Sequence, residues 1–135
     1  MTIPAALRAK LNAQAQESCP VLTVDEFFEG NHDLGSIGCN LSPAPPLEVF
    51  RRVLLGIAAR PDVQSVLVRV TEDMGDEWPF SDQVFVLTSV PVEEVGAWLA
   101  ELQPEDPYVA EEWSGPTTFL PALRPGMRPV VAWWD

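Results

Sequence analysis

Apolar residues recur along this chain with two periods, which predict helices and strands in turn. Between residues 45 and 60 they return every three to four positions, which predicts a helix bounded by proline at both ends. Residues 64–71 alternate apolar and polar side chains, as in a strand with one buried face. Residues 84–88 are apolar on both faces, which favours a strand in the middle of a sheet.

Two further helices and a last strand complete the pattern. Residues 4–16 predict a helix whose apolar stripe is thin and rich in alanine, so we expect it at the periphery. A third helix starts at Pro91, and its apolar stripe runs from Val92 to Leu102. Residues 130–134 predict a closing strand. Because side chains alternate along a strand, Trp133 and Trp134 should point to opposite faces, one into the core and one toward a covering segment or a partner.

Residues 21–40 allow two interpretations. The strand-forming residues of 21–29, the turn-forming residues of 30–35 and the segment 36–40 together favour a β-hairpin. Alternatively, Thr23 and Glu26 match a capping box, which predicts a short helical turn that ends at Gly30. We prefer the hairpin, since so short a helix is weak on its own. In a hairpin Cys19 and Cys39 lie too far apart for a disulfide, so we expect two free thiols.

The order of these elements predicts an α+β protein. We expect a single, mainly antiparallel sheet of four or five strands with two or three helices packed on one face. Residues 1–135 then form a single α+β domain, with a peripheral helix in 1–18 and a proline-rich, irregular wrapping segment in 103–128. The concentration of six of the fourteen prolines in the last 33 residues supports that wrapping segment.

Charge narrows the possible partners. The chain has 20 acidic residues, eight lysines and arginines, and a net charge of −12. Nucleic acids and anionic membrane surfaces repel such a chain, so we expect neither as a partner. The first residues lack the apolar stretch of a secretory signal, which favours a cytoplasmic location. The sequence favours no particular oligomeric state.

The negative charge is concentrated in residues 70–123, which contain twelve acidic residues and neither lysine nor arginine. A surface of one sign attracts a partner of the opposite sign and speeds their encounter. We therefore expect a non-catalytic protein that binds a basic protein partner. Small acidic immunity and antitoxin proteins share this composition, an analogy of composition alone.

The connection 72–82 is the expected centre of this binding surface, because its acids surround two aromatic residues that would anchor a partner. The candidate partner-binding residues are Asp73, Asp76, Glu77, Trp78, Phe80 and Asp82. The competing interpretation is structural: the acids are only solvated, and the aromatic residues fill the core.

Catalytic signals are sparse. His32 is the one histidine, Lys10 is the one lysine, and no nucleophile elbow or phosphate-binding glycine loop occurs. The spacing of histidine, cysteine and acidic residues matches neither a zinc site nor an EF-hand, so we expect no cofactor. The alternative function is a small carboxylate- or metal-dependent hydrolase that uses the acids of 72–82.

Overall fold

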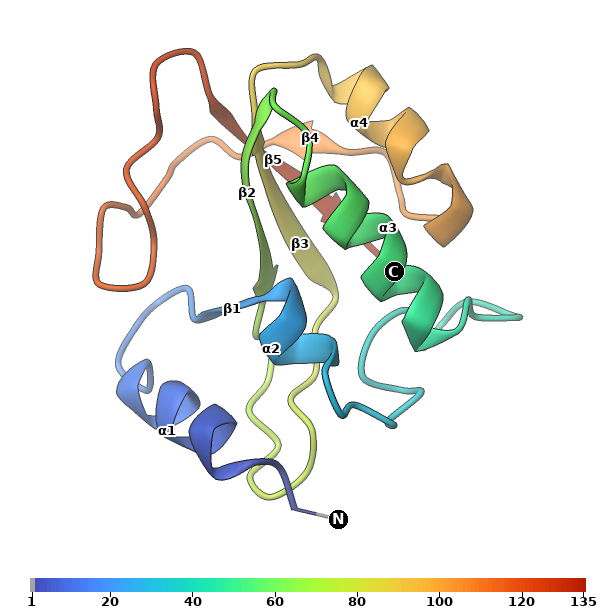
Figure 1. Ribbon diagram of the computed structural model, residues 1–135, viewed down its shortest axis with the longest axis vertical. Coiled ribbons are helices and arrows are strands. Elements are labelled where there is room, and N and C mark those ends of the chain that lie inside the picture. The colour runs from blue at the N-terminus through green and yellow to red at the C-terminus, as the bar shows by residue number, and fades with distance from the viewer. Residues whose placement is uncertain (1) are drawn as a thin grey trace.

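The computed structural model describes residues 2–135 and contains one antiparallel sheet of five strands, in the order β1-β2-β3-β5-β4. Helices pack against one face of this sheet (Figure 1), which confirms the predicted α+β class. The elements in chain order are α1 (Ala5–Ala13), β1 (Val21–Thr23), α2 (Val24–Phe28), α3 (Leu47–Ala58), β2 (Val63–Arg69), β3 (Gln83–Thr88), α4 (Val92–Trp98), a 3₁₀ turn (Ala100–Leu102), β4 (Tyr108–Val109) and β5 (Arg128–Trp133).

The main core lies between the helices and the sheet. On α3, Phe50, Leu54 and Ile57 recur at helical spacing and are buried. They pack in one cluster with the inner-face residues of the strands, among them Val68 and Val84. The predicted central strand is confirmed as well: β3 pairs with β2 on one side and β5 on the other, and Val84 to Leu87 are all buried.

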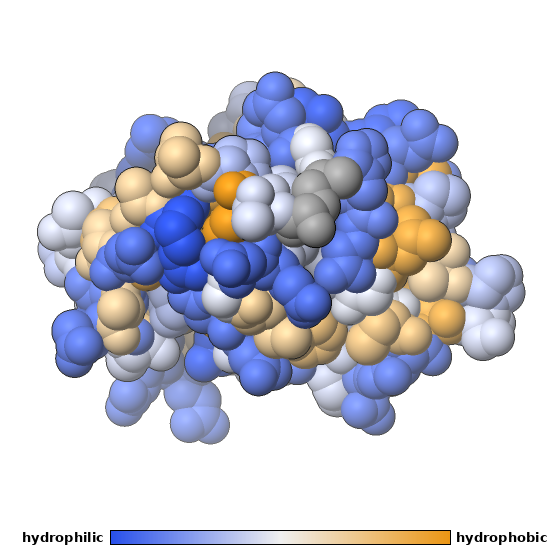
Figure 2. Space-filling view, turned by 90° about the horizontal axis from the view of Figure 1, so that it is seen from below, coloured by the Kyte–Doolittle hydropathy of each residue, from blue (hydrophilic) through white to orange (hydrophobic). Residues whose placement is uncertain are grey.

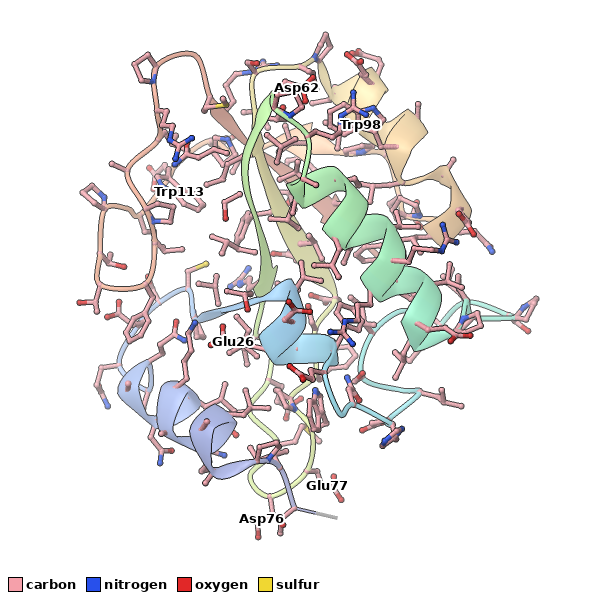
Figure 3. All side chains as sticks on the ribbon, in the orientation of Figure 1. Glu26, Asp62, Asp76, Glu77, Trp98 and Trp113 are labelled. Atoms are coloured by element: carbon pink, nitrogen blue, oxygen red, sulfur yellow. The ribbon has the colours of Figure 1, made fainter. Side chains whose placement is uncertain are left out.

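The second face of the sheet is covered by the chain between β4 and β5, which crosses it as irregular structure (Figure 1). Leu120 packs there in one cluster with Leu67, Phe85 and Val131. Trp113, on the left in Figure 3, packs edge-on against Phe85 at 5.5 Å between ring centroids. Its indole N–H donates to the Pro121 carbonyl at 2.8 Å. This covering explains why β3 and β5 are apolar on both faces and why Leu67 of β2 is buried on its otherwise polar outer face.

The two C-terminal tryptophans confirm the alternation expected of a strand. Trp134 is buried on the helix side, where its indole N–H donates to the Leu102 carbonyl at 2.8 Å. Trp133 is half-buried on the opposite face and packs against the cluster around Phe85.

The hairpin expected from residues 21–29 and 36–40 is wrong. Only Val21 to Thr23 form a strand, and this strand pairs with β2 rather than with residues 36–40. The next five residues form α2, and Thr23 and Glu26 make both hydrogen bonds of the capping box. Burial of Phe27 and Phe28 against α3 stabilises this short helix, which would be weak in isolation. Cys19 and Cys39 are both free thiols.

The peripheral α1 closes the open edge of the sheet. Leu7 and Leu11 turn into the core, and Gln14 follows the helix with its side chain buried. The Gln14 amide donates to the Val21 carbonyl and accepts from the Val21 N–H, both at 2.8 Å. A side-chain amide thus takes the place of a neighbouring strand and blocks edge-to-edge pairing at β1.

Candidate functional site

The predicted binding loop is an extension of the β2–β3 hairpin beyond the end of the sheet. Phe80 donates to the Glu72 carbonyl at 2.9 Å, and its own carbonyl accepts from Thr71 and Glu72. The five residues from Asp73 to Glu77 form the tip. Asp76 and Glu77 lie at the far end of the molecule (Figure 3) and are exposed to solvent.

This tip is held in place on both sides. The Ile3 N–H donates to the Asp76 carbonyl at 3.2 Å, and Arg8 binds both the Asp73 carboxylate and the Gly75 carbonyl. From the other side, the Ser81 N–H donates to the Ser36 carbonyl at 2.8 Å. The loop therefore presents its carboxylates from a fixed position.

The two aromatic residues of the loop turn toward the protein. Trp78 is only 9% exposed, and its indole N–H donates to the Phe27 carbonyl at 2.7 Å. Phe80 is half-buried beside it and, like Trp78, lines a shallow hollow with Asp33 and Cys39. The exposed surface of the loop comes mainly from Glu72, Asp73, Asp76 and Glu77, together with Met74.

A second segment, which the sequence did not single out, adjoins the loop. Asp33 lines shallow hollows together with Glu77 and Glu72, and Glu29 is exposed just before it. Two large apolar side chains are exposed here: Leu34 at 73% and Met74 at 40%. The sequence contains a pattern that could have identified this second acidic segment: residues 11–50 contain neither lysine nor arginine.

We call this surface the acidic end and define it by the carboxylates of residues 29–46 and 71–82. They are Glu29, Asp33, Glu72, Asp73, Asp76, Glu77 and Asp82. Neither segment contains lysine or arginine. Figure 2 looks onto the molecule from this side, where hydrophilic residues predominate and hydrophobic ones appear between them.

Within residues 2–135, one of these seven carboxylates is in an ion pair, that of Asp73 with Arg8. The hydrogen bond from Arg8 lowers the pKa of the Asp73 carboxyl, although partial burial opposes this effect. Within the described residues none of the other six carboxylates forms an ion pair, although Asp76 lies close enough to Arg8 for their charges to interact, so the acidic end keeps most of its negative charge.

The acidic run 70–123 does not form one continuous face, which corrects the expectation of a single-signed surface. The hairpin tip follows Arg69 and precedes Gln83, at one end of the β2–β3 ladder. The α4 acids Glu93 and Glu94 follow Thr88, at the opposite end of that ladder (Figure 1). A strand of this length separates the two groups by about 20 Å. Near α4, Glu101 is neutralised by Arg52 at 2.7 Å.

The arrangement suits attraction of cations at an open surface. Within residues 2–135, no group of three or more histidine, cysteine or acidic side chains is arranged to hold a metal ion. His32 lines a hollow with Glu77 and Trp78. The hydrolase hypothesis for residues 72–82 stays a prediction.

Among the described residues, no helix has the length and apolarity needed to cross a membrane.

Comparison with known proteins places the chain in a family. A family model described as "Uncharacterized protein YfbO family" matches residues 3–132. The protein "Uncharacterized protein YfbO" of Escherichia coli (strain K12) is 36% identical over 118 residues, which cover 86% of this chain and 83% of that protein. No solved structure matches the chain. The match over nearly the whole length and the identity to this relative show that the chain belongs to the YfbO family.

Proposed function

We propose that this protein binds a basic segment of another protein through the acidic end. The observation that carries the proposal is the set of six carboxylates outside any ion pair among the described residues, held together at one end of the sheet. Opposite charges across an interface accelerate encounter and fix the relative orientation of the partners.

The fixed geometry of the tip supports the proposal. The loop is tied to Ile3, Arg8 and Ser36, so little conformational freedom is lost when a partner binds. Binding surfaces that are ordered beforehand avoid part of the entropic cost of association.

The exposed apolar side chains define the partner further. Leu34 and Met74 lie in the same two segments as the carboxylates and offer apolar contact area between the charges. A partner that carries leucine among its lysines can use both kinds of contact, whereas a purely cationic partner uses only the charges.

The first experiment is a titration of the ¹⁵N-labelled protein with two short cationic peptides, observed by NMR. One peptide contains lysine and leucine, and the other has serine in place of leucine at equal charge. We expect both to shift amide signals of residues 29–39 and 71–82, with the leucine peptide bound more tightly. Shifts confined to other surfaces would refute the proposal.

A pair of charge-matched variants separates location from net charge. Asp76→Asn with Glu77→Gln removes two charges from the acidic end, and Glu93→Gln with Glu94→Gln removes two from α4. We expect the first pair to weaken binding of the leucine peptide by about tenfold, since two exposed charged contacts of about 0.7 kcal/mol each amount to about 1.4 kcal/mol. We expect the second pair to leave its affinity nearly unchanged. Equal losses would mean that only the overall charge matters.

A further inference from the structure

One row of the outer sheet face differs from the apolar rows beside it. Arg69, Gln83 and Trp133 are paired across β2, β3 and β5, so their side chains stand side by side on the face opposite the helices. Each of them is half-buried. The next row on the same face is Leu67, Phe85 and Val131, all buried in the second core cluster.

This row holds two hydrogen-bond donors without acceptors. Within residues 2–135, the buried side-chain nitrogen and oxygen atoms that lack a partner are Arg69 Nε and Trp133 Nε1. Buried polar groups are nearly always hydrogen-bonded, because an unsatisfied one costs free energy. That two such donors share one row and one face points to a common acceptor.

The Arg69 guanidinium is positioned by a neutral partner. Its Nη1 donates to Gln83 Oε1 at 2.8 Å, and no carboxylate within residues 2–135 forms an ion pair with it. In contrast, Arg51 uses its Nε and Nη2 together to bind Asp25. The Nε edge of a guanidinium is the one that binds a planar carboxylate with two hydrogen bonds.

The positive charge of Arg69 is therefore uncompensated at a half-buried position, although the chain contains 20 acidic residues. Cys19 lies close enough for this charge to act on its thiol: burial raises the pKa of Cys19, and Arg69 opposes that rise. A monoanion would balance one positive charge, whereas a dianion would leave a net negative charge in a partly buried place.

We propose that Arg69, Gln83 and Trp133 form a binding site for a small carboxylate. The ligand accepts hydrogen bonds from the Nε edge of Arg69 and from the Trp133 indole N–H, while Gln83 holds the guanidinium in place. This site lies on the outer sheet face and is independent of the acidic end.

The test is a titration of ¹⁵N-labelled protein with sodium acetate, in which sodium chloride keeps the ionic strength constant. The Arg69 Nε–H and Trp133 indole signals are assigned from the variants Arg69→Lys and Trp133→Phe. We expect both signals to shift saturably with the same dissociation constant, while the other four tryptophan indoles stay in place.

The same variants test the assignment of roles. Arg69→Lys keeps the charge and removes the planar donor edge, and Trp133→Phe keeps an aromatic ring and removes the N–H. We expect Arg69→Lys to weaken acetate binding by about tenfold and Trp133→Phe to weaken it severalfold. The control Arg124→Gln, which removes an exposed charge, leaves the affinity unchanged.

Three results would overturn the proposal: no saturable shift at either signal, an equal effect of Arg124→Gln, or tighter binding of inorganic phosphate than of acetate. If Arg69→Lys does not fold, as judged by the dispersion of its amide signals, the acetate affinity of Trp133→Phe is the test of the site. Unchanged acetate affinity in that variant then overturns the site.

Discussion

At the scale of single residues, Trp78 links the acidic hairpin tip to the core. Its ring is buried, and its N–H reaches the Phe27 carbonyl, which also accepts from the Asn31 side chain. The sequence marked this position as aromatic within an acidic loop, a pattern shared by interface anchors and core residues. Only the three-dimensional path of α2 beneath the loop distinguishes between the two.

Trp78→Phe should therefore reduce stability and not binding. We expect the free energy of unfolding to fall by about 1–3 kcal/mol, because a buried hydrogen bond and part of a ring are lost. Chemical denaturation measures this change. The affinity for the leucine peptide should stay within a factor of two or so. A large loss of affinity at unchanged stability would identify Trp78 as a contact residue instead.

The Arg8–Asp73 pair makes a pH-dependent contribution to stability. Its hydrogen bond lowers the folded-state pKa of Asp73 below the ordinary value of 3.8. The contribution is therefore fully present above that ordinary value and is lost as the pH falls through the lower folded-state pKa.

Asp73→Asn should accordingly destabilise the protein at neutral pH by under about 1 kcal/mol, since the Asp73 side chain is 43% exposed. The difference from the unmodified protein should shrink as the pH drops below about 4. Denaturation curves at several pH values measure it, and Arg8→Gln should show the same pH dependence. A difference that grows on acidification would contradict this assignment.

At the scale of elements, the sequence pattern predicted helices and strands correctly where residues close together in the sequence determine the structure. The helix over 47–58, the central strand 83–88 and the start of α4 after Pro91 follow from periodicity and proline positions. The error at residues 21–40 arose because β1 pairs with Val68 and its neighbours, far away in sequence. The capping box at Thr23 was visible, but the burial of Phe27 and Phe28 that stabilises α2 was not.

The segment between β4 and β5 contributes a second core through a few side chains. Leu120 is 3% exposed, although its segment contains no helix or strand. We expect Leu120→Ala to lower the free energy of unfolding by about 2–5 kcal/mol, as for a buried leucine elsewhere. Thermal or chemical denaturation measures it.

The matched control is Leu34→Ala, at an exposed position of the acidic end. This change should alter stability by less than about 0.5 kcal/mol. If the two variants were equally stable, the segment would not form a second core.

At the scale of the whole molecule, the charge pattern of the sequence predicts the distribution of charge on the surface only in part. The acidic run was evident from the sequence, but its division between two ends of the β2–β3 ladder depends on where the chain turns after each strand. The contribution of Glu29 and Asp33 to the acidic end likewise depends on contacts between distant segments. The sequence did not identify Arg69 as part of a binding site, because Gln83 and Trp133 are brought beside it only by strand pairing.

The most direct measurement of the central claim is the salt dependence of binding at the acidic end. The dissociation constant of the leucine peptide is measured from about 0.01 to 0.15 M ionic strength, for the unmodified protein and for Asp76→Asn with Glu77→Gln. We predict steep weakening with salt in the unmodified protein and a clearly shallower dependence in the variant, because two of the attracting charges are gone. Binding that does not respond to salt, or the same slope in both proteins, would contradict the account.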